Sequence, residues 1–146
     1  METSDRLVAE DQLKAFARDL FIAAGVPEGD AALIAGVLIW SNLRGVDSHG
    51  VLRIPGYLAR IDSGITNADP NIQVVIDLPA AAVLDADSSF GQIALARGSE
   101  IAIEKAGAAG IGLCLIRHTV HMGAIGYFTL EIAAEGMAGI AINTSR

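Results

Sequence analysis

Residues 41–57 bring together side chains that could transfer a proton and bind an anion. This segment holds a histidine, two arginines, an aspartate and several hydroxyl groups, in a chain that is 52% hydrophobic and only 18% charged. A histidine has an ordinary pKa of about 6.5, so it gives and takes a proton near neutral pH. An arginine keeps its charge and presents a planar fork that fits a carboxylate. The combination indicates a site where a small carboxylic acid binds and a proton moves.

Within this segment His49 is the leading candidate for the acid–base group. Arg53 follows it by four residues and Arg44 precedes it by five, so both could reach a carboxylate bound beside the imidazole. Arg44 is the weaker of the two, because an arginine at a helix end commonly binds the free carbonyls of that helix. A simple turn or capping role is the structural alternative for His49.

Two other kinds of site deserve comparison with this interpretation. His118 and His121 lie three residues apart and could join His49 in a three-histidine zinc site, although the chain has no His-Glu-x-x-His motif. The adjacent Asp47, Ser48 and His49 contain the residue types of a serine triad. A triad, however, is assembled from positions distant in the sequence, and no Gly-x-Ser-x-Gly motif is present.

A second segment, residues 121–127, has the character of a cofactor loop. Gly123 and Gly126 allow the backbone to approach a flat ring or a phosphate, and free amides at a helix that starts near Ile125 attract negative charge. The glycines of residues 107–112 differ from a Rossmann fingerprint, because they precede a predicted strand and do not lead from a strand into a helix.

Residues 44–51 with Arg53 and Tyr57, followed by residues 121–127, resemble the two signature segments of the malate/L-lactate dehydrogenase family. The resemblance extends from residue 13 to the end of the chain. This family contains NAD(P)-dependent 2-hydroxyacid oxidoreductases, among them ureidoglycolate and sulfolactate dehydrogenases and a cyclic imino-acid reductase, and it is distinct from the Rossmann-type lactate and malate dehydrogenases.

The resemblance implies an α/β fold of the non-Rossmann type, NAD or NADP as cofactor, and a small 2-hydroxy or 2-oxo acid of the malate or L-lactate kind as substrate. It also implies a homodimer or higher homo-oligomer with sites near the subunit interface. Family members continue beyond the point where this chain stops. We therefore expect an N-terminal portion with a C-terminally incomplete fold.

The resemblance also implies roles for individual residues. His49 and His121 compete for the acid–base role, with Ser48 in the proton relay, while His118 is peripheral. The expected catalytic residues are Ser48, His49 and His121, the expected substrate-binding residues are Arg53, Tyr57 and Arg44, and the expected cofactor-binding residues are His121, Met122, Gly123, Ala124, Ile125 and Ser145. No metal ligand is expected.

Composition narrows the class of protein. Ten basic and seventeen acidic residues give a net charge of -7, which argues against a nucleic-acid partner. No apolar run approaches the ~18 residues of a membrane span, and no basic region precedes an apolar segment at the start, so a cytoplasmic protein without membrane association is expected. Cys114, the single cysteine, lies in an apolar run and is predicted to be a buried small side chain.

Apolar periodicity and turn residues predict a helical segment, residues 1–66, that carries the Ser-His motif, and the start of an α/β cofactor-binding domain, residues 67–146. The predicted helices are residues 13–24, 31–40, 55–63, 91–106 and 125–134, and the predicted strands are residues 72–77, 81–85, 110–116 and 137–143. Residues 87–89 are expected to cap the long helix, and residues 117–123 to form a polar loop.

An alternative to an active enzyme is a truncated chain that only self-associates. The helix at residues 31–40 is apolar almost all round, and the strand predicted at residues 137–143 is strongly apolar. If the remainder of the family fold is absent, both should leave apolar surface uncovered.

Overall fold

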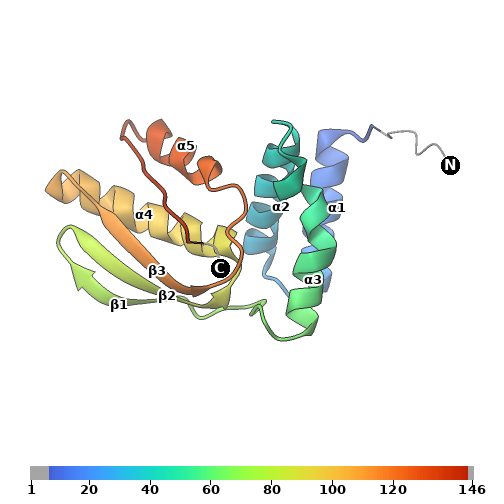
Figure 1. Ribbon diagram of the computed structural model, residues 1–146, viewed down its shortest axis with the longest axis horizontal. Coiled ribbons are helices and arrows are strands. Elements are labelled where there is room, and N and C mark those ends of the chain that lie inside the picture. The colour runs from blue at the N-terminus through green and yellow to red at the C-terminus, as the bar shows by residue number, and fades with distance from the viewer. Residues whose placement is uncertain (1–6, 145–146) are drawn as a thin grey trace.

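A computed structural model describes residues 7–144. Three helices lie side by side at one end of the molecule, and a three-stranded sheet with a long helix across it forms the other end (Figure 1). The fold is therefore α/β, as predicted, with N-terminal helices followed by a mixed layer. The elements are α1 (Glu10–Ala23), α2 (Glu28–Asn42), α3 (Ile54–Asp62), β1 (Gln73–Leu78), β2 (Ala81–Ser89), α4 (Gly91–Ala109), β3 (Leu113–Thr119) and α5 (Gly126–Ala134).

The sheet has the order β1-β2-β3. β1 and β2 pair antiparallel across a tight turn, whereas β2 and β3 pair parallel and are joined by α4. A parallel pair requires such a crossover, and α4 supplies it while it covers one face of the sheet. Both β2 and β3 end beside the helical part of the molecule, so the segments that follow them lie next to α2 and α3.

The core joins the three N-terminal helices to the start of α4. Phe21 of α1 is fully buried. Its ring packs edge-on against Phe90, with 5.8 Å between ring centres, and lies tilted against Tyr57 of α3 at 6.4 Å. Burial of one such ring contributes about 1.5–3 kcal/mol. This aromatic cluster fixes where Tyr57 lies relative to α4.

The helix predicted at residues 31–40 is confirmed as a deeply buried element, α2. Ile34 and Leu38 have no exposed surface, and Ile39 has 3%. The expectation that this helix would leave apolar surface uncovered is wrong, because α1 and α4 pack against it within the chain.

The strand predicted at residues 137–143 does not form. This segment runs back over α5, so close to it that a side chain at Gly139 would lie 2.9 Å from Ile132, and it pairs with no strand in residues 7–144. Ile140 and Ile142 remain 88% and 87% exposed. The segment, α4, α5 and β3 line an apolar pocket of about 630 Å³ that is open to solvent, and Cys114 in its wall is only half-buried.

Two predicted boundaries are also wrong. Residues 87–89 do not cap α4, because they belong to β2, and Phe90 occupies the N-cap without a capping side chain. Asp87 instead accepts hydrogen bonds from the Asn67 side chain and the Asn71 amide, each at 2.9 Å. β3 begins and ends three residues later than predicted, so Arg117 lies in the strand.

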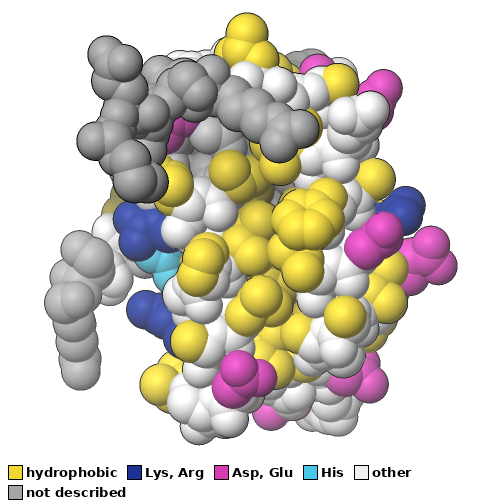
Figure 2. Space-filling model, turned by 90° about the vertical axis from the view of Figure 1, so that its right-hand side faces the viewer, with side chains coloured by type: hydrophobic (Ala, Val, Ile, Leu, Met, Phe, Trp, Pro, Cys, Tyr) yellow, Lys and Arg dark blue, Asp and Glu magenta, His cyan; other side chains and the backbone are white. Residues whose placement is uncertain are grey.

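Apolar side chains gather in the middle of the face that α1 and α3 present to solvent (Figure 2). Phe16, Leu52 and Ile65, which belong to these helices or to the turns beside them, are 59%, 72% and 57% exposed. Within residues 7–144, no helix combines the length and apolar character that crossing a lipid bilayer requires.

Candidate active site

Two short 3-10 turns, η1 (Asp47–His49) and η2 (Val51–Arg53), connect α2 to α3. Ser48 and His49 lie in η1, and Arg53 lies in η2. Asn42, the last residue of α2, holds the two turns together. Its amide nitrogen donates to Asp47 Oδ1 at 2.5 Å, and its oxygen accepts from the Val51 amide at 2.9 Å. Gly50 packs directly on this amide, since a Cβ there would lie 2.2 Å from Asn42 Oδ1. Asn42 and Gly50 thus fix the position of His49.

The two candidate histidines meet. The rings of His49 and His121 lie 5.6 Å apart, centre to centre, with 31° between their planes. Ser48 Oγ lies 3.0 Å from His49 Nδ1. The Nε atom of Arg53 donates to the Ser48 carbonyl at 2.5 Å. The structure therefore brings four of the predicted site residues together from two distant segments.

Tyr57 links α3 to the second segment. Its side chain is buried, and its hydroxyl lies 2.8 Å from His121 Nδ1. The same hydroxyl accepts a hydrogen bond from Gln92 Nε2 at 3.0 Å, and the Gly123 amide donates to His121 Nδ1 at 3.2 Å. Burial raises the pKa of the Tyr57 phenol, so its hydroxyl keeps its proton at neutral pH.

The electrostatic surroundings of His121 favour a neutral ring. Burial is the largest cause that lowers its pKa below 6.5, and the positive charge of Arg53 lowers it further. The Arg53 charge therefore acts on the imidazole, and it would attract an anion bound beside the ring.

The predicted cofactor loop lies against the start of α4. A Cβ on Gly91 would lie 2.3 Å from Met122 Cα, and Gly123 has a positive φ of 67°. In the described part of the chain, the backbone amides of Met122, Ala124 and Ile125 donate to no carbonyl or side chain. The loop thus offers free donors next to His121.

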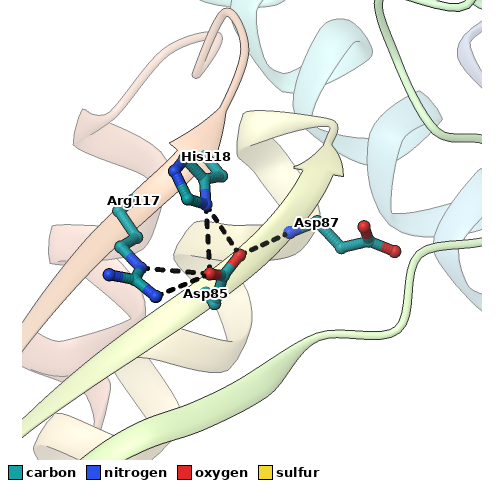
Figure 3. Close-up of polar contacts among 4 residues, drawn as sticks. All are labelled: Asp85, Asp87, Arg117 and His118. Carbon is teal, nitrogen blue, oxygen red and sulfur yellow. Dashed lines mark hydrogen bonds and ion pairs between the residues drawn. The ribbon is translucent and has the colours of Figure 1, made fainter.

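Three predicted or considered residues fall outside this cluster. The Arg44 guanidinium stacks 4.0 Å over the Trp40 ring, where it contacts neither histidine of the pair. Ser145 lies outside the described residues. His118 points to Asp85, with Nδ1 3.0 Å from the carboxylate, and Arg117 binds the same carboxylate at 3.0 Å (Figure 3).

The position of His118 argues against a zinc site formed by the three histidines. Because His118 pairs with Asp85, it does not join His49 and His121, and no group of three or more His, Cys, Asp or Glu side chains within residues 7–144 is arranged to hold a metal ion. Hydrogen bonds hold the pKa of the Asp85 carboxyl below its usual range. The largest effect comes from the bond that the Asp87 amide donates, and His118 and Arg117 add to it (Figure 3).

Gln92 and Asn42 are the site residues that the sequence did not reveal. Gln92 is fully buried although it lies in the first turn of α4, and its only local signal is an amide that follows an apolar residue and a glycine. Its partner Tyr57 is 35 positions away, so spacing alone could not have connected them.

Comparison with known proteins points to the same family as the two sequence motifs. Residues 8–146 match the family described as malate/L-lactate dehydrogenase. The chain belongs to this family. The malate dehydrogenase of Pyrococcus horikoshii OT3 has a similar structure, with a TM-score of 0.87 and 41% identity over 89% of this chain and 37% of that protein.

Two further relatives carry other names. The L-sulfolactate dehydrogenase of Methanocaldococcus jannaschii is 36% identical over 127 residues, which are 87% of this chain and 37% of that protein. The delta1-piperideine-2-carboxylate reductase of Pseudomonas syringae has a TM-score of 0.82 and 30% identity over 90% of this chain and 40% of that protein. The chain thus spans about two-fifths of the length of these family members.

Proposed function

We propose that this chain carries the Ser-His motif and the cofactor loop of an oxidoreductase that transfers a hydride between NAD or NADP and C2 of a small 2-hydroxy or 2-oxo acid, of the malate or L-lactate type. The observation that carries the proposal is the meeting of His49 and His121, from two separate motifs, beside Arg53. Relatives named malate dehydrogenase and L-sulfolactate dehydrogenase support this reaction class.

The loop at residues 121–125 fits a nicotinamide dinucleotide. The free amides of Met122, Ala124 and Ile125 suit a carboxamide or phosphate oxygen. Gly123, with its positive φ, allows the loop to turn while it packs closely against the Gln92 side chain. When bound, the nicotinamide would supply or accept the hydride.

Arg53 is proposed to bind the substrate carboxylate. Its Nε is used on the Ser48 carbonyl, which leaves the two terminal nitrogens of the guanidinium for an anion. This anchor holds the fork still, so a carboxylate bound there keeps a defined position relative to both imidazoles.

His121 is proposed to exchange the proton at the substrate oxygen. Its Nδ1 accepts two hydrogen bonds, so the neutral ring carries its proton on Nε2. In the reducing direction Nε2–H donates this proton to the carbonyl oxygen at C2 while the hydride arrives at C2, and a 2-hydroxy acid results. In the oxidising direction Nε2 takes the proton back. His49, backed by Ser48, is the competing candidate, and mutation separates the two.

The test compares three histidine substitutions in a fusion that adds the part of the P. horikoshii malate dehydrogenase that this chain does not span. NADH and NADPH oxidation is followed with oxaloacetate, pyruvate and other 2-oxo acids. We expect His121→Ala to lower turnover by about 10²–10⁴-fold, the usual contribution of a positioned acid–base group. His118→Ala is the matched control and should have no effect, because His118 contacts Asp85.

Two outcomes would contradict the proposal. One is a folded fusion that oxidises neither nucleotide with any 2-oxo acid. The other is a fusion in which His121→Ala and His49→Ala both retain full turnover.

The alternative, a chain that only self-associates when alone, is favoured by the exposure of Ile140 and Ile142. Sedimentation of the 146-residue chain measures this directly. Oligomers without NAD(P)H turnover would support it, whereas a compact monomer would exclude it.

A further inference from the structure

Gln92 has an unusual position for an amide. It is fully buried, its Nε2 donates to the Tyr57 hydroxyl at 3.0 Å, and its Oε1 has no hydrogen-bond partner in the described part of the chain. A buried acceptor without a partner carries a desolvation cost that an apolar side chain of similar size would not carry. The contribution of Gln92 must therefore come from its donor.

The direction of the hydrogen bonds can be derived from one backbone amide. The Gly123 N–H can only donate, so His121 Nδ1 must accept and carries no proton. The Tyr57 hydroxyl, 2.8 Å from the same nitrogen, must then donate its single hydrogen to it.

This leaves the Tyr57 oxygen as an acceptor only, so the group that faces it from Gln92 must be the NH2. The orientation of the Gln92 amide follows from this network. The shorter of the two bonds to Nδ1 thus depends on Gln92, because a partner that accepted from Tyr57 would turn the hydroxyl away from His121.

We propose that Gln92 is a positioning residue that acts through Tyr57 to hold the neutral ring of His121 in the tautomer with its proton on Nε2. In this tautomer Nδ1 faces the protein with its two donors, and Nε2–H is left for a ligand oxygen. The catalytic consequence rests on the function proposed above, whereas the tautomer is a property of the folded chain itself.

The variant that tests this most directly is Gln92→Glu. In its ionised form, the carboxylate has nearly the same shape but can only accept, so it takes the Tyr57 hydrogen and leaves His121 Nδ1 with the weaker Gly123 bond alone. Because burial raises the pKa of a carboxyl group, the variant is measured at the highest pH at which it stays folded. Gln12→Glu is the control: it adds the same charge at an exposed position of α1, in a different element from Gln92.

The measurement is the tautomer of each histidine in the 15N-labelled 146-residue chain, read from long-range proton–nitrogen correlations of the ring above the pKa of His121. We expect one Nε2–H species for His121 in the parent and in Gln12→Glu, and a mixture of the two tautomers in Gln92→Glu. His49 and His118 serve as internal references, because Gln92 contacts neither.

Tyr57→Phe provides a second variant that keeps the ring in the aromatic core but removes the hydroxyl. It should also give a tautomer mixture for His121. If either folded variant keeps the pure Nε2–H form, or if the parent carries the proton on Nδ1, the proposal is wrong.

Activity distinguishes this proposal from the proposed function. In the fusion protein, Gln92→Glu should lower kcat for the 2-oxo acid by about tenfold or more with KM little changed, since general acid catalysis depends on the protonated nitrogen facing the substrate. If the tautomer changes as expected but the parent fusion turns over no substrate, the reaction is misassigned and the role of Gln92 stands.

Discussion

Gly91→Ala should reveal how closely the loop at residues 121–125 depends on the start of α4. A Cβ at this position would lie 2.3 Å from Met122 Cα and 2.7 Å from the His121 carbonyl oxygen, where ordinary contacts begin at 3.4 Å. Both neighbours are backbone atoms, so no rotation of a side chain can relieve the clash. The loop or the helix must move by about 1 Å, and the loop carries His121.

The expected cost follows from two opposing effects. Overpacking of this kind destabilises a protein by about 1–3 kcal/mol, whereas alanine in place of glycine favours a helix by up to about 1 kcal/mol. We expect a net loss of about 1–2 kcal/mol for Gly91→Ala. Gly107→Ala, in the same helix, meets no atom within 4 Å and should instead stabilise the chain by about 0.5–1 kcal/mol.

The assay is urea unfolding followed by far-ultraviolet circular dichroism, with the parent, Gly91→Ala and Gly107→Ala measured side by side. The same samples are titrated by NMR at His121. Displacement of the loop should weaken the bond between Tyr57 and His121 and expose the ring, so its pKa should move back toward 6.5. Equal stabilisation by both substitutions, with an unchanged His121 titration, would refute the claim that the loop lies in contact with Gly91.

Three further perturbations test the site and the core. Because folding lowers the pKa of His121 below 6.5, its contribution to stability is complete above pH 6.5 and should be lost as pH falls below that value. Unfolding curves measured from pH 8 to 4 should show this loss in the parent, and a His121→Asn variant should lack this pH-dependent part of the unfolding free energy. Arg53→Gln should raise the pKa of His121 in NMR titrations. In the fusion, Arg53→Lys should have a higher KM for a 2-oxo acid than the parent, since an ammonium does not replace a guanidinium fork. An unchanged pKa together with an unchanged KM would exclude Arg53 from the site. Phe21→Ala should cost about 3–5 kcal/mol of unfolding free energy, whereas Phe16→Ala, whose ring is 59% exposed, should change it by less than about 0.5 kcal/mol.

The sequence predicted those elements whose formation depends on local pattern. Apolar spacing predicted α1 and α2, and Pro55 at the first turn of α3 predicted that Tyr57 lies inside that helix. Resemblance to a family implied that residues 44–57 and residues 121–127 serve one site, because no local pattern relates segments so far apart.

The wrong predictions share one cause, which is that distant partners decide the outcome. Arg117 and His118 looked like a polar loop, yet both extend β3 because Asp85 on the neighbouring strand binds them. Residues 87–89 looked like a helix cap, but Asn67 and Asn71 occupy the Asp87 carboxylate. The segment at residues 137–143 has the composition of a strand, but a strand requires a neighbour, and here the segment packs along α5.

Three consecutive residues at the start of α4 explain why the site and the core cannot be altered separately. Phe90 packs in the aromatic cluster with Phe21 and Tyr57. Gly91 lets the loop at residues 121–125 approach, and Gln92 donates to Tyr57. Phe90 is the N-cap of α4, and Gly91 and Gln92 are its first two residues, so the three positions belong to one short stretch of backbone and contact three different neighbours. Any shift of α4 that repacks Phe90 therefore also moves the contact at Gly91 and the donor at Gln92. The proposed boundary at residue 66 divides this arrangement, because Tyr57 lies before it, whereas Gln92 and His121 lie after it. Residues 1–66 and residues 67–146 therefore each hold an incomplete site, which the aromatic core joins.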